Sequence, residues 1–210
     1  EILSEEARQK KSRIYDISED NLNFKEKAGK YIDFLNANAY DKERDVRTNI
    51  AGEFQKSNLA AALQTAELIC GRLDEDKIYE ALSQIRISGR MEEIAPGIIV
   101  DVSHNIQGMQ GFVQTVEANY HGMKKRILFA ASHQNEEEYM KNILKTIPEI
   151  EAFYTVGIHK RRIDEAEFQD AFRKMIDRNQ ETTVCFVVGS FYLAGMAKEF
   201  INQEEENVRL

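Results

Sequence analysis

The second half of the chain alternates between continuous apolar runs and stretches with helical periodicity. The apolar runs are "GIIVD", "KRILFAAS", "EAFYTVGI" and "TTVCFVVGS", which start at residues 97, 125, 151 and 182. Each run is followed by an amphipathic stretch long enough for a helix, the first being "IQGMQGFVQTVEANY". Apolar strands that alternate with amphipathic helices are typical of a mostly parallel sheet covered by helices on both faces. We therefore predict a complete α/β domain over residues 89–210.

The first half, residues 1–88, has a weaker pattern. The segment "RIYDI" at residues 13–17 predicts a short strand, and "KYIDFLNANAYDKERDV" at residues 30–46 predicts the strands of a hairpin. We interpret this half as the rest of another domain and place the boundary near Ser88–Gly89.

Two helices are predicted between the hairpin and the boundary. The first runs from Leu59 to Cys70, with Ser57 or Asn58 as the N-cap and Gly71 at its C-terminal end. Its buried face is predicted from residues at helical spacing, which are Leu59, Ala62, Leu63, Ala66 and Ile69. The second lies within "DEDKIYEALSQI", where Ile78, Leu82 and Ile85 share one stripe.

Composition narrows the classes of protein. Hydrophobic residues make up 42% of the 210 residues, which is enough for a core. The formal net charge of -8 argues against a nucleic-acid binder, because phosphate contacts need a basic face. No apolar run approaches the ~20 residues that span a bilayer. The two cysteines, Cys70 and Cys185, lack metal-binding spacing and favour a cytosolic protein with reduced thiols. We expect neither a membrane nor a nucleic-acid partner.

Polar side chains follow each predicted strand of the α/β domain. Asp101, Ser103 and His104 follow the first strand, and Ser190 follows the last. The second and third strands are followed by "SHQ" and "HKRR". Because open α/β sheets bind ligands outside the carboxyl ends of their strands, these side chains predict one shared site.

Each member of this group also has a structural interpretation. Asp101 could brace the turn that follows it, and His104 could be a hydrogen-bonded loop residue. The "HKRR" run could be a solvated turn or could attract an anion. "DVSHN" lacks the spacing of a helical zinc site, so no metal ligands are assigned. Ser190 lacks the G-x-S-x-G elbow, and "NIQGMQG" is not a dinucleotide fingerprint.

Four motifs in order resemble a known family. They lie in "GEFQKSNLAAALQTAELI", "SGRMEEIAPGIIVDVSHNIQGMQGF" and "VVGSFYLAG". The chain resembles the folylpolyglutamate synthase and dihydrofolate synthase branch of the Mur ligase superfamily, whose pattern reads G-x-H-Q-x-x-N-A, G-R-x-E, D-G-A-H-N-P and G-S-L-Y. The resemblance implies that residues 1–88 are the C-terminal part of a central ATPase domain. It also implies that residues 89–210 are a Rossmann-like C-terminal domain.

The activity implied by the resemblance is an ATP-dependent amide ligation. The family phosphorylates a carboxylate of folate or dihydropteroate to an acyl phosphate, which the amine of L-glutamate then attacks. The glycine-rich phosphate loop and the Mg²⁺ ligands of the family have no counterpart in this sequence and are expected upstream. This chain alone is therefore expected to be inactive, and a monomer is expected.

Roles for individual residues follow by motif position. The resemblance implies that Asn58 contacts adenine, Arg90 the ATP phosphates and Asp101 the nucleotide, through its ribose. It implies that His104 acts as a catalytic and substrate-binding residue near the incoming glutamate or acyl phosphate. Ser190 is implied to help hold the glutamate.

The sequence also departs from the family pattern. Phe54 stands where the family often has His, Val102 and Ser103 replace Gly-Ala, and Ile106 replaces Pro. "ASHQNEEEY" lacks the Lys-Asp that often follows the second strand. Two alternatives stay open: a Mur-type ligase that joins an amino acid to a peptidoglycan precursor, and a non-catalytic α/β binding module.

Overall fold

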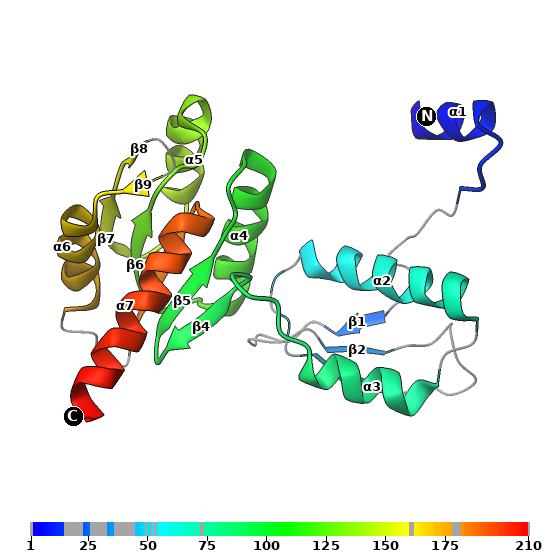
Figure 1. Cartoon of the computed structure of the whole chain (residues 1–210), viewed down its shortest axis with the longest axis horizontal. Coiled ribbons are helices and arrows are strands. Elements are labelled where there is room, and N and C mark those ends of the chain that lie inside the picture. The colour runs from blue at the N-terminus through cyan, green and yellow to red at the C-terminus, as the bar shows by residue number, and fades with distance from the viewer. Residues whose placement is uncertain are drawn as a thin grey trace.

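The computed structural model describes residues 2–14, 23–25, 33–35, 45–48, 50, 52, 54–71, 74–159, 162–177 and 182–209. Its elements fall into two groups along the chain (Figure 1). The first group contains helix α1 (Ile2–Gln9), strands β1 (Asn23–Lys25), β2 (Asp33–Leu35) and β3 (Asp45–Arg47), and helices α2 (Phe54–Cys70) and α3 (Glu75–Gln84). Ser88 and Gly89 lie between α3 and the second group, and the domain boundary placed there stays a prediction.

The predicted hairpin is present in the first group. β1, β2 and β3 form a three-stranded antiparallel sheet in sequential order, and the β2–β3 pair is the hairpin predicted over residues 30–46. The strand predicted at residues 13–17 lies mostly outside the described residues, because only Arg13 and Ile14 are described there. Helix α1, which was not predicted, has no buried residue.

Two predictions about α2 are wrong. The helix begins at Phe54, so Ser57 and Asn58 lie inside its first turns and do not cap it. Only part of the predicted face is covered: Leu59 is buried, but Ile69 is 77% exposed. Periodicity shows which residues share a face, but a face is buried only where another element packs against it. In contrast, Gly71 ends α2 with φ of +76°, and Asp74 caps α3 by accepting from Lys77 N.

The second group is built on a five-stranded sheet. Its strands are β4 (Glu92–Ala95), β5 (Ile98–Asp101), β6 (Lys124–Phe129), β7 (Ile150–Thr155) and β10 (Thr183–Val188), in the order β4-β5-β10-β6-β7. The four predicted strands are all present, and every pairing among them is parallel. β4 was not predicted and pairs antiparallel with β5 at the edge. β10 is the central strand, and all its residues are buried.

Helices cover both faces of this sheet (Figure 1). α4 (Ile106–Asn119) and α5 (Glu137–Leu144) pack on one face, with Ile99 and Phe186 in their core. α6 (Glu165–Ile176) and α7 (Phe191–Arg209) pack on the other, with Val100 and Val187 in theirs. Neighbouring strand residues enter opposite cores because side chains alternate along a strand. The predicted mostly parallel sheet with helices on both faces is therefore confirmed.

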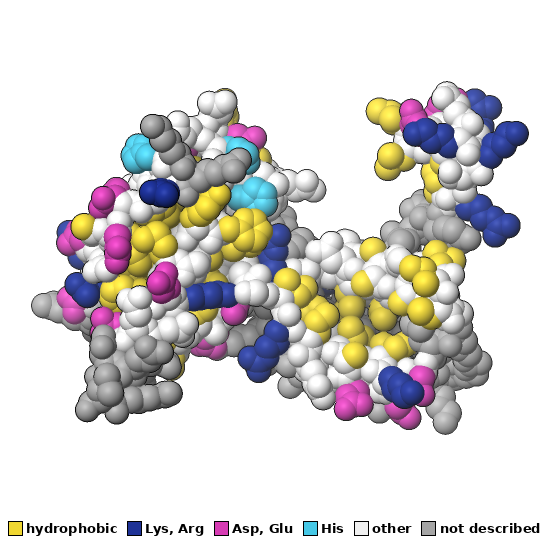
Figure 2. All heavy atoms as spheres, viewed as in Figure 1, with side chains coloured by type: hydrophobic (Ala, Val, Ile, Leu, Met, Phe, Trp, Pro, Cys, Tyr) yellow, Lys and Arg dark blue, Asp and Glu magenta, His cyan; other side chains and the backbone are white. Residues whose placement is uncertain are grey.

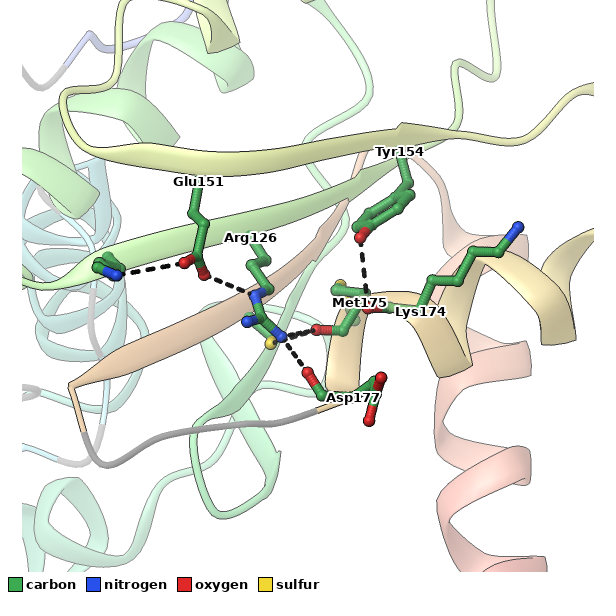
Figure 3. A network of polar contacts seen from close by, with 8 residues as sticks. Arg126, Glu151, Tyr154, Lys174, Met175 and Asp177 are labelled. Atoms are coloured by element: carbon green, nitrogen blue, oxygen red, sulfur yellow. Dashed lines mark hydrogen bonds and ion pairs between the residues drawn. The ribbon is translucent and has the colours of Figure 1, made fainter.

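A polar network joins β6 and β7 to the end of α6 (Figure 3). Arg126 Nε donates to Glu151 Oε2 at 2.9 Å, and its Nη1 donates to the carbonyl oxygens of Met175, at 3.0 Å, and Asp177. Met175 lies in the last turn of α6 and Asp177 is its C-cap residue, at the end where backbone acceptors lack helical partners. Tyr154 Oη donates to the carbonyl of Lys174 at 3.3 Å. The guanidinium therefore fastens the end of α6 to the sheet.

Candidate functional site

The predicted site lies at the carboxyl ends of β5, β10 and β6, where the helices that follow neighbouring strands cover opposite faces of the sheet. The helices that follow β5 and β6 are α4 and α5, on one face, whereas the helix that follows β10 is α7, on the other. Adjacent strands that send their helices to opposite faces leave a crevice between the strand ends. Figure 2 shows histidine side chains gathered at one end of this group, next to exposed hydrophobic side chains.

His104 is half-buried in the turn between β5 and α4. Its Nδ1 lies 2.9 Å from the carbonyl oxygen of Val102. Since a carbonyl oxygen only accepts, this contact is a hydrogen bond when Nδ1 carries the proton. The neutral ring then presents the lone pair of Nε2. The ring lies 5.6 Å from Phe191 and 6.4 Å from His133, centroid to centroid. In its neutral form with the proton on Nδ1, His104 can act as a hydrogen-bond acceptor or general base through Nε2.

Asp101 is fully buried at the end of β5. Its Oδ2 accepts from Met91 N at 3.0 Å and its Oδ1 from Ser103 N at 2.8 Å. Burial raises the pKa of Asp101 above its usual value, although Ser103, the backbone N–H groups and the charge of Arg90 oppose that shift. The Ser103 hydroxyl lies near without the geometry of a hydrogen bond. In this conformation Asp101 braces the turn, so its contact with a nucleotide stays a prediction.

Arg90 lies on the loop that enters β4, and it is half-buried. The loop is anchored on both sides of it. Gly89 O accepts from Val102 N at 2.8 Å, and the next residue, Met91, donates to Asp101. Gly89 has φ of +71°, and a Cβ there would lie 2.7 Å from Val102 Cγ1, so a side chain would clash. These two contacts hold the Arg90 loop against Val102 and Asp101, and the roles assigned to these residues stay predictions.

Ser190 is fully buried between β10 and α7, and it caps the helix. Its Oγ accepts from Tyr192 N at 3.1 Å. Gly189 precedes it with φ of +111°, and a Cβ there would lie 2.6 Å from the carbonyl oxygen of Ala130. This close approach of β10 to the end of β6 places Ser190 beside the residues that follow β6. Phe191, which is 58% exposed, connects this segment to the His104 ring.

The segments after β6 and β7 complete this edge. His133 is exposed at the start of the short helix η2 (Gln134–Glu136) and makes no capping bond with its side chain. His159 and Arg162 lie on the small hairpin of β8 (Ile158–His159) and β9 (Arg162–Ile163). Gln134 Nε2 lies 3.5 Å from the carbonyl of Ile158, which links this hairpin to η2. The two middle residues of "HKRR" lie outside the described residues.

Asn58 is the one predicted site residue that lies apart from this edge. It is exposed on α2, in the first group of elements, and its Nδ2 donates to Gln55 Oε1 at 2.9 Å. Its predicted contact with adenine stays a prediction.

The edge is suited to anions. The helices α4 and α7 both begin here, with Asn105 Oδ1 accepting from Gly108 N at 2.7 Å in α4. The amino ends of helices carry partial positive charge and attract carboxylates and phosphates. Within the described part of the chain, no cluster of three or more histidine, cysteine or acidic side chains could hold a metal ion. No helix among the described residues is both long and apolar enough to cross a membrane.

Two features of the site were not predicted from the sequence. One is the contact of Phe191 with His104, and the other is an ion pair between Glu92 and Lys198 beside Arg90. The partners of each contact are far apart in the sequence, and no local pattern marks them. The "GRMEE" motif was the only signal that included Glu92.

Comparison with known proteins gives a clear result for the fold. No protein-family model matches the chain, and no curated protein matches it in sequence. A folylpolyglutamate synthase in complex with AMPPCP and folate superimposes with a TM-score of 0.76 at 20% identity, covering 95% of this chain and 50% of that one. FolC of E. coli in complex with ADP gives 0.78 at 14% identity, covering 97% and 51%. A pseudomurein peptide ligase of Methanothermus fervidus gives 0.62 at 18% identity, covering 87% and 42%.

The chain spans about half the length of the folylpolyglutamate synthase and FolC structures that it matches. At these identities the likeness establishes the fold, and it confirms the resemblance predicted from the four motifs at that level. The same fold is present in enzymes of folate metabolism and in a peptide ligase. Because one fold supports several reactions, the reaction must be assigned from the site.

Proposed function

We propose that this chain is the C-terminal half of an ATP-dependent ligase that adds L-glutamate to folate or dihydropteroate through an acyl phosphate. The observation that carries the proposal is the convergence of Arg90, Asp101, His104 and Ser190 at one edge of a fold found in folylpolyglutamate synthases. In this proposal residues 1–88 belong to a central ATPase domain and residues 89–210 form the C-terminal domain. The enzyme is proposed to be a cytosolic monomer.

His104 is proposed to act on the attacking amine. An amine must lose a proton as it forms an amide bond, and a neutral imidazole with a lone pair on Nε2 can accept that proton. The hydrogen bond from Nδ1 to Val102 O supports this tautomer. The exposed Phe191 ring lies 5.6 Å from the His104 ring, centroid to centroid.

Ser190 is proposed to hold the amino acid through a carboxylate, a contact that would require its buried hydroxyl to become exposed. A hydroxyl that accepts one hydrogen bond keeps its proton for donation, and Ser190 Oγ already accepts from Tyr192 N. The amino end of α7 adds favourable partial charge for an anion. Both properties fit a carboxylate of L-glutamate better than its ammonium group.

Arg90 is proposed to bind the ATP phosphates, and Asp101 is proposed to bind the nucleotide. A guanidinium is always charged and can form paired hydrogen bonds with phosphate oxygens. Asp101 already accepts two backbone N–H groups, so its first contribution is to hold the Arg90 loop against the His104 turn. Its direct contact with ribose would require the buried carboxylate to become exposed.

When bound, ATP with Mg²⁺ would supply the phosphoryl group that activates the substrate carboxylate. The described residues offer a cation for phosphate but no cluster of metal ligands. We therefore propose that Mg²⁺ and the phosphate loop are held by the other half of the enzyme. Asn58 on α2 is proposed to contact adenine from the ATPase domain.

A second candidate is a ligase that joins amino acids to a cell-wall precursor. The likeness to the pseudomurein peptide ligase supports it, and "DVSHN" fits both groups. The "GSFYL" segment favours the folate branch, because that branch has a late G-S-L-Y motif. A non-catalytic binding module is the third possibility, and it predicts no turnover.

The assay is ADP release by the full-length protein that contains this chain. We expect release only when ATP, L-glutamate and either folate or dihydropteroate are all present. Release with a muramyl or pseudomurein precursor instead would support the second candidate, and no release with any substrate would support the third.

Substitution of Arg90 separates its role from a general charge effect. Arg90→Ala is expected to lower kcat/KM for ATP by more than about tenfold, or ~1.4 kcal/mol. Arg86→Ala is the matched control, because Arg86 is an exposed arginine just before the junction. Equal effects of the two substitutions would remove Arg90 from the proposed site.

A further inference from the structure

The loop that carries Arg90 is tied to helix α7 by a compact group of polar side chains. Glu92 Oε2 accepts from Lys198 Nζ at 2.6 Å, from Gly89 N at 2.6 Å and from Ser88 Oγ at 3.3 Å. Lys198 Nζ also donates to Ser88 Oγ at 2.5 Å. Four groups are thus joined in a closed arrangement, which we name the junction clamp. It consists of Ser88, Gly89, Glu92 and Lys198.

The clamp is partly shielded from solvent. The side chains of Lys198 and Glu92 are 28% and 35% exposed. Burial alone would raise the pKa of Glu92, but the hydrogen bonds from Lys198 and Gly89 lower it below its usual value. Glu92 is therefore ionised at neutral pH, and its charge is matched by the ammonium group of Lys198.

The Arg90 loop is held at the residues before and after Arg90 in the sequence. The clamp binds the two residues before Arg90, whereas Asp101 accepts from Met91 N directly after it. Met91 has φ of +46°, an uncommon value for a residue with a side chain, so the loop is held in a defined shape. The Arg90 side chain therefore extends from a short backbone segment that is anchored at both ends.

We propose that Lys198, acting through Glu92, is a positioning residue for Arg90. This inference rests on the proposed function, because it assigns Arg90 to the ATP phosphates. Lys198 lies on α7, which begins directly after Ser190, so the same helix holds the amino-acid end of the site and the Arg90 loop. Geometry that is fixed before binding lowers the entropy lost when phosphate binds.

A purely structural role makes a different prediction. An ion pair at the surface contributes little to folding, typically 0 to ~1 kcal/mol. Lys174 and Asp170 form an ion pair of the same length on α6, at 2.6 Å, but their side chains are 60% and 64% exposed and make no contact with the Arg90 loop among the described residues. If Lys198 only stabilised the fold, its loss would lower stability without a selective rise in KM for ATP.

The experiment compares Lys198→Met, Lys198→Arg and the control Lys174→Met in the full-length enzyme. For Lys198→Met we expect KM for ATP to rise about fivefold or more, with kcat and KM for the amino acid changed less than about twofold. Lys198→Arg should restore KM for ATP to within about twofold of the unsubstituted enzyme, since it keeps the charge. The control should change none of these constants.

Hydrogen exchange provides a measurement that does not depend on turnover. Loss of the ammonium group should speed exchange of the Gly89 amide by about tenfold, because its acceptor Glu92 is no longer held. Unchanged exchange would overturn the clamp, and faster exchange with unchanged KM for ATP would overturn the positioning role. A wild-type enzyme without ATP-dependent turnover would overturn the proposed function, and with it the role assigned to Arg90.

Discussion

Replacement of Arg126 by Met tests how the end of α6 is fastened to the sheet. The substitution keeps the apolar stem but removes donors to the carbonyls of Met175 and Asp177 and to the carboxylate of Glu151 (Figure 3). The side chain of Arg126 is 13% exposed, so water replaces these bonds incompletely.

The expected loss of stability follows from which acceptors keep a partner. Hydrogen bonds that involve a charged group contribute about 1.5–3 kcal/mol each. Met175 O still accepts from Cys185 Sγ at 3.4 Å, and the exposed Glu151 carboxylate can be rehydrated. We therefore expect a total loss of about 2–4 kcal/mol, below the sum of the separate bonds.

Urea unfolding measured by far-UV circular dichroism checks this value, because the chain contains no Trp for fluorescence. Tyr154→Phe is the control at the same helix end, since it removes only the 3.3 Å bond to Lys174 O, and it should cost less than about 1 kcal/mol. A loss for Arg126→Met that is no larger than that for Tyr154→Phe would refute the fastening role.

Three further predictions follow from the described contacts. Gly189→Ala should lower stability by about 2–4 kcal/mol in the same urea assay, because its Cβ would lie 2.6 Å from Ala130 O at φ of +111°; an unchanged midpoint would show that the strand end adapts. The hydrogen bond from Arg126 lowers the pKa of Glu151 below the unfolded value of 4.5. The ionised Glu151 therefore contributes to stability above pH 4.5, and this contribution is lost as the pH falls through the lower folded pKa. The urea midpoint should therefore fall between pH 6 and 3 more steeply in the wild type than in Arg126→Met. Burial raises the pKa of Cys185 to about 11, so a thiol reagent at pH 8 should modify the exposed Cys70 alone in the folded chain, and two fast-reacting thiols would contradict this.

The parallel sheet could be predicted because its strands are apolar on both sides. "TTVCFVVGS" is buried along its whole strand, as an inner strand between two helical layers must be. The antiparallel strand Glu92–Ala95 was missed because "EEIA" is half polar and lies at the edge. The strand order could not be predicted either, because hydrophobic periodicity identifies strands along the chain but not which strands pair in the sheet.

The candidate site could be predicted only in part. Polar residues at strand ends identified Asp101, His104 and Ser190, because parallel strands bring their carboxyl ends to one edge. The bonds that define their roles join distant segments: Asp101 with Met91, and Lys198 with Glu92. Such contacts depend on the three-dimensional arrangement of β4, β5 and α7, which no local pattern encodes. Exposure of Ile69 was missed for the same reason.

The central position of β10 has a consequence for the order in which the sheet can form. During synthesis β4, β5, β6 and β7 are complete before Thr183 is added, yet β5 and β6 are joined only through β10. Until then the chain holds two separate strand pairs, each with an unpaired inner edge that can pair with other chains. A chain that ends before Thr183 would therefore lack the strand that joins β5 to β6 in this sheet.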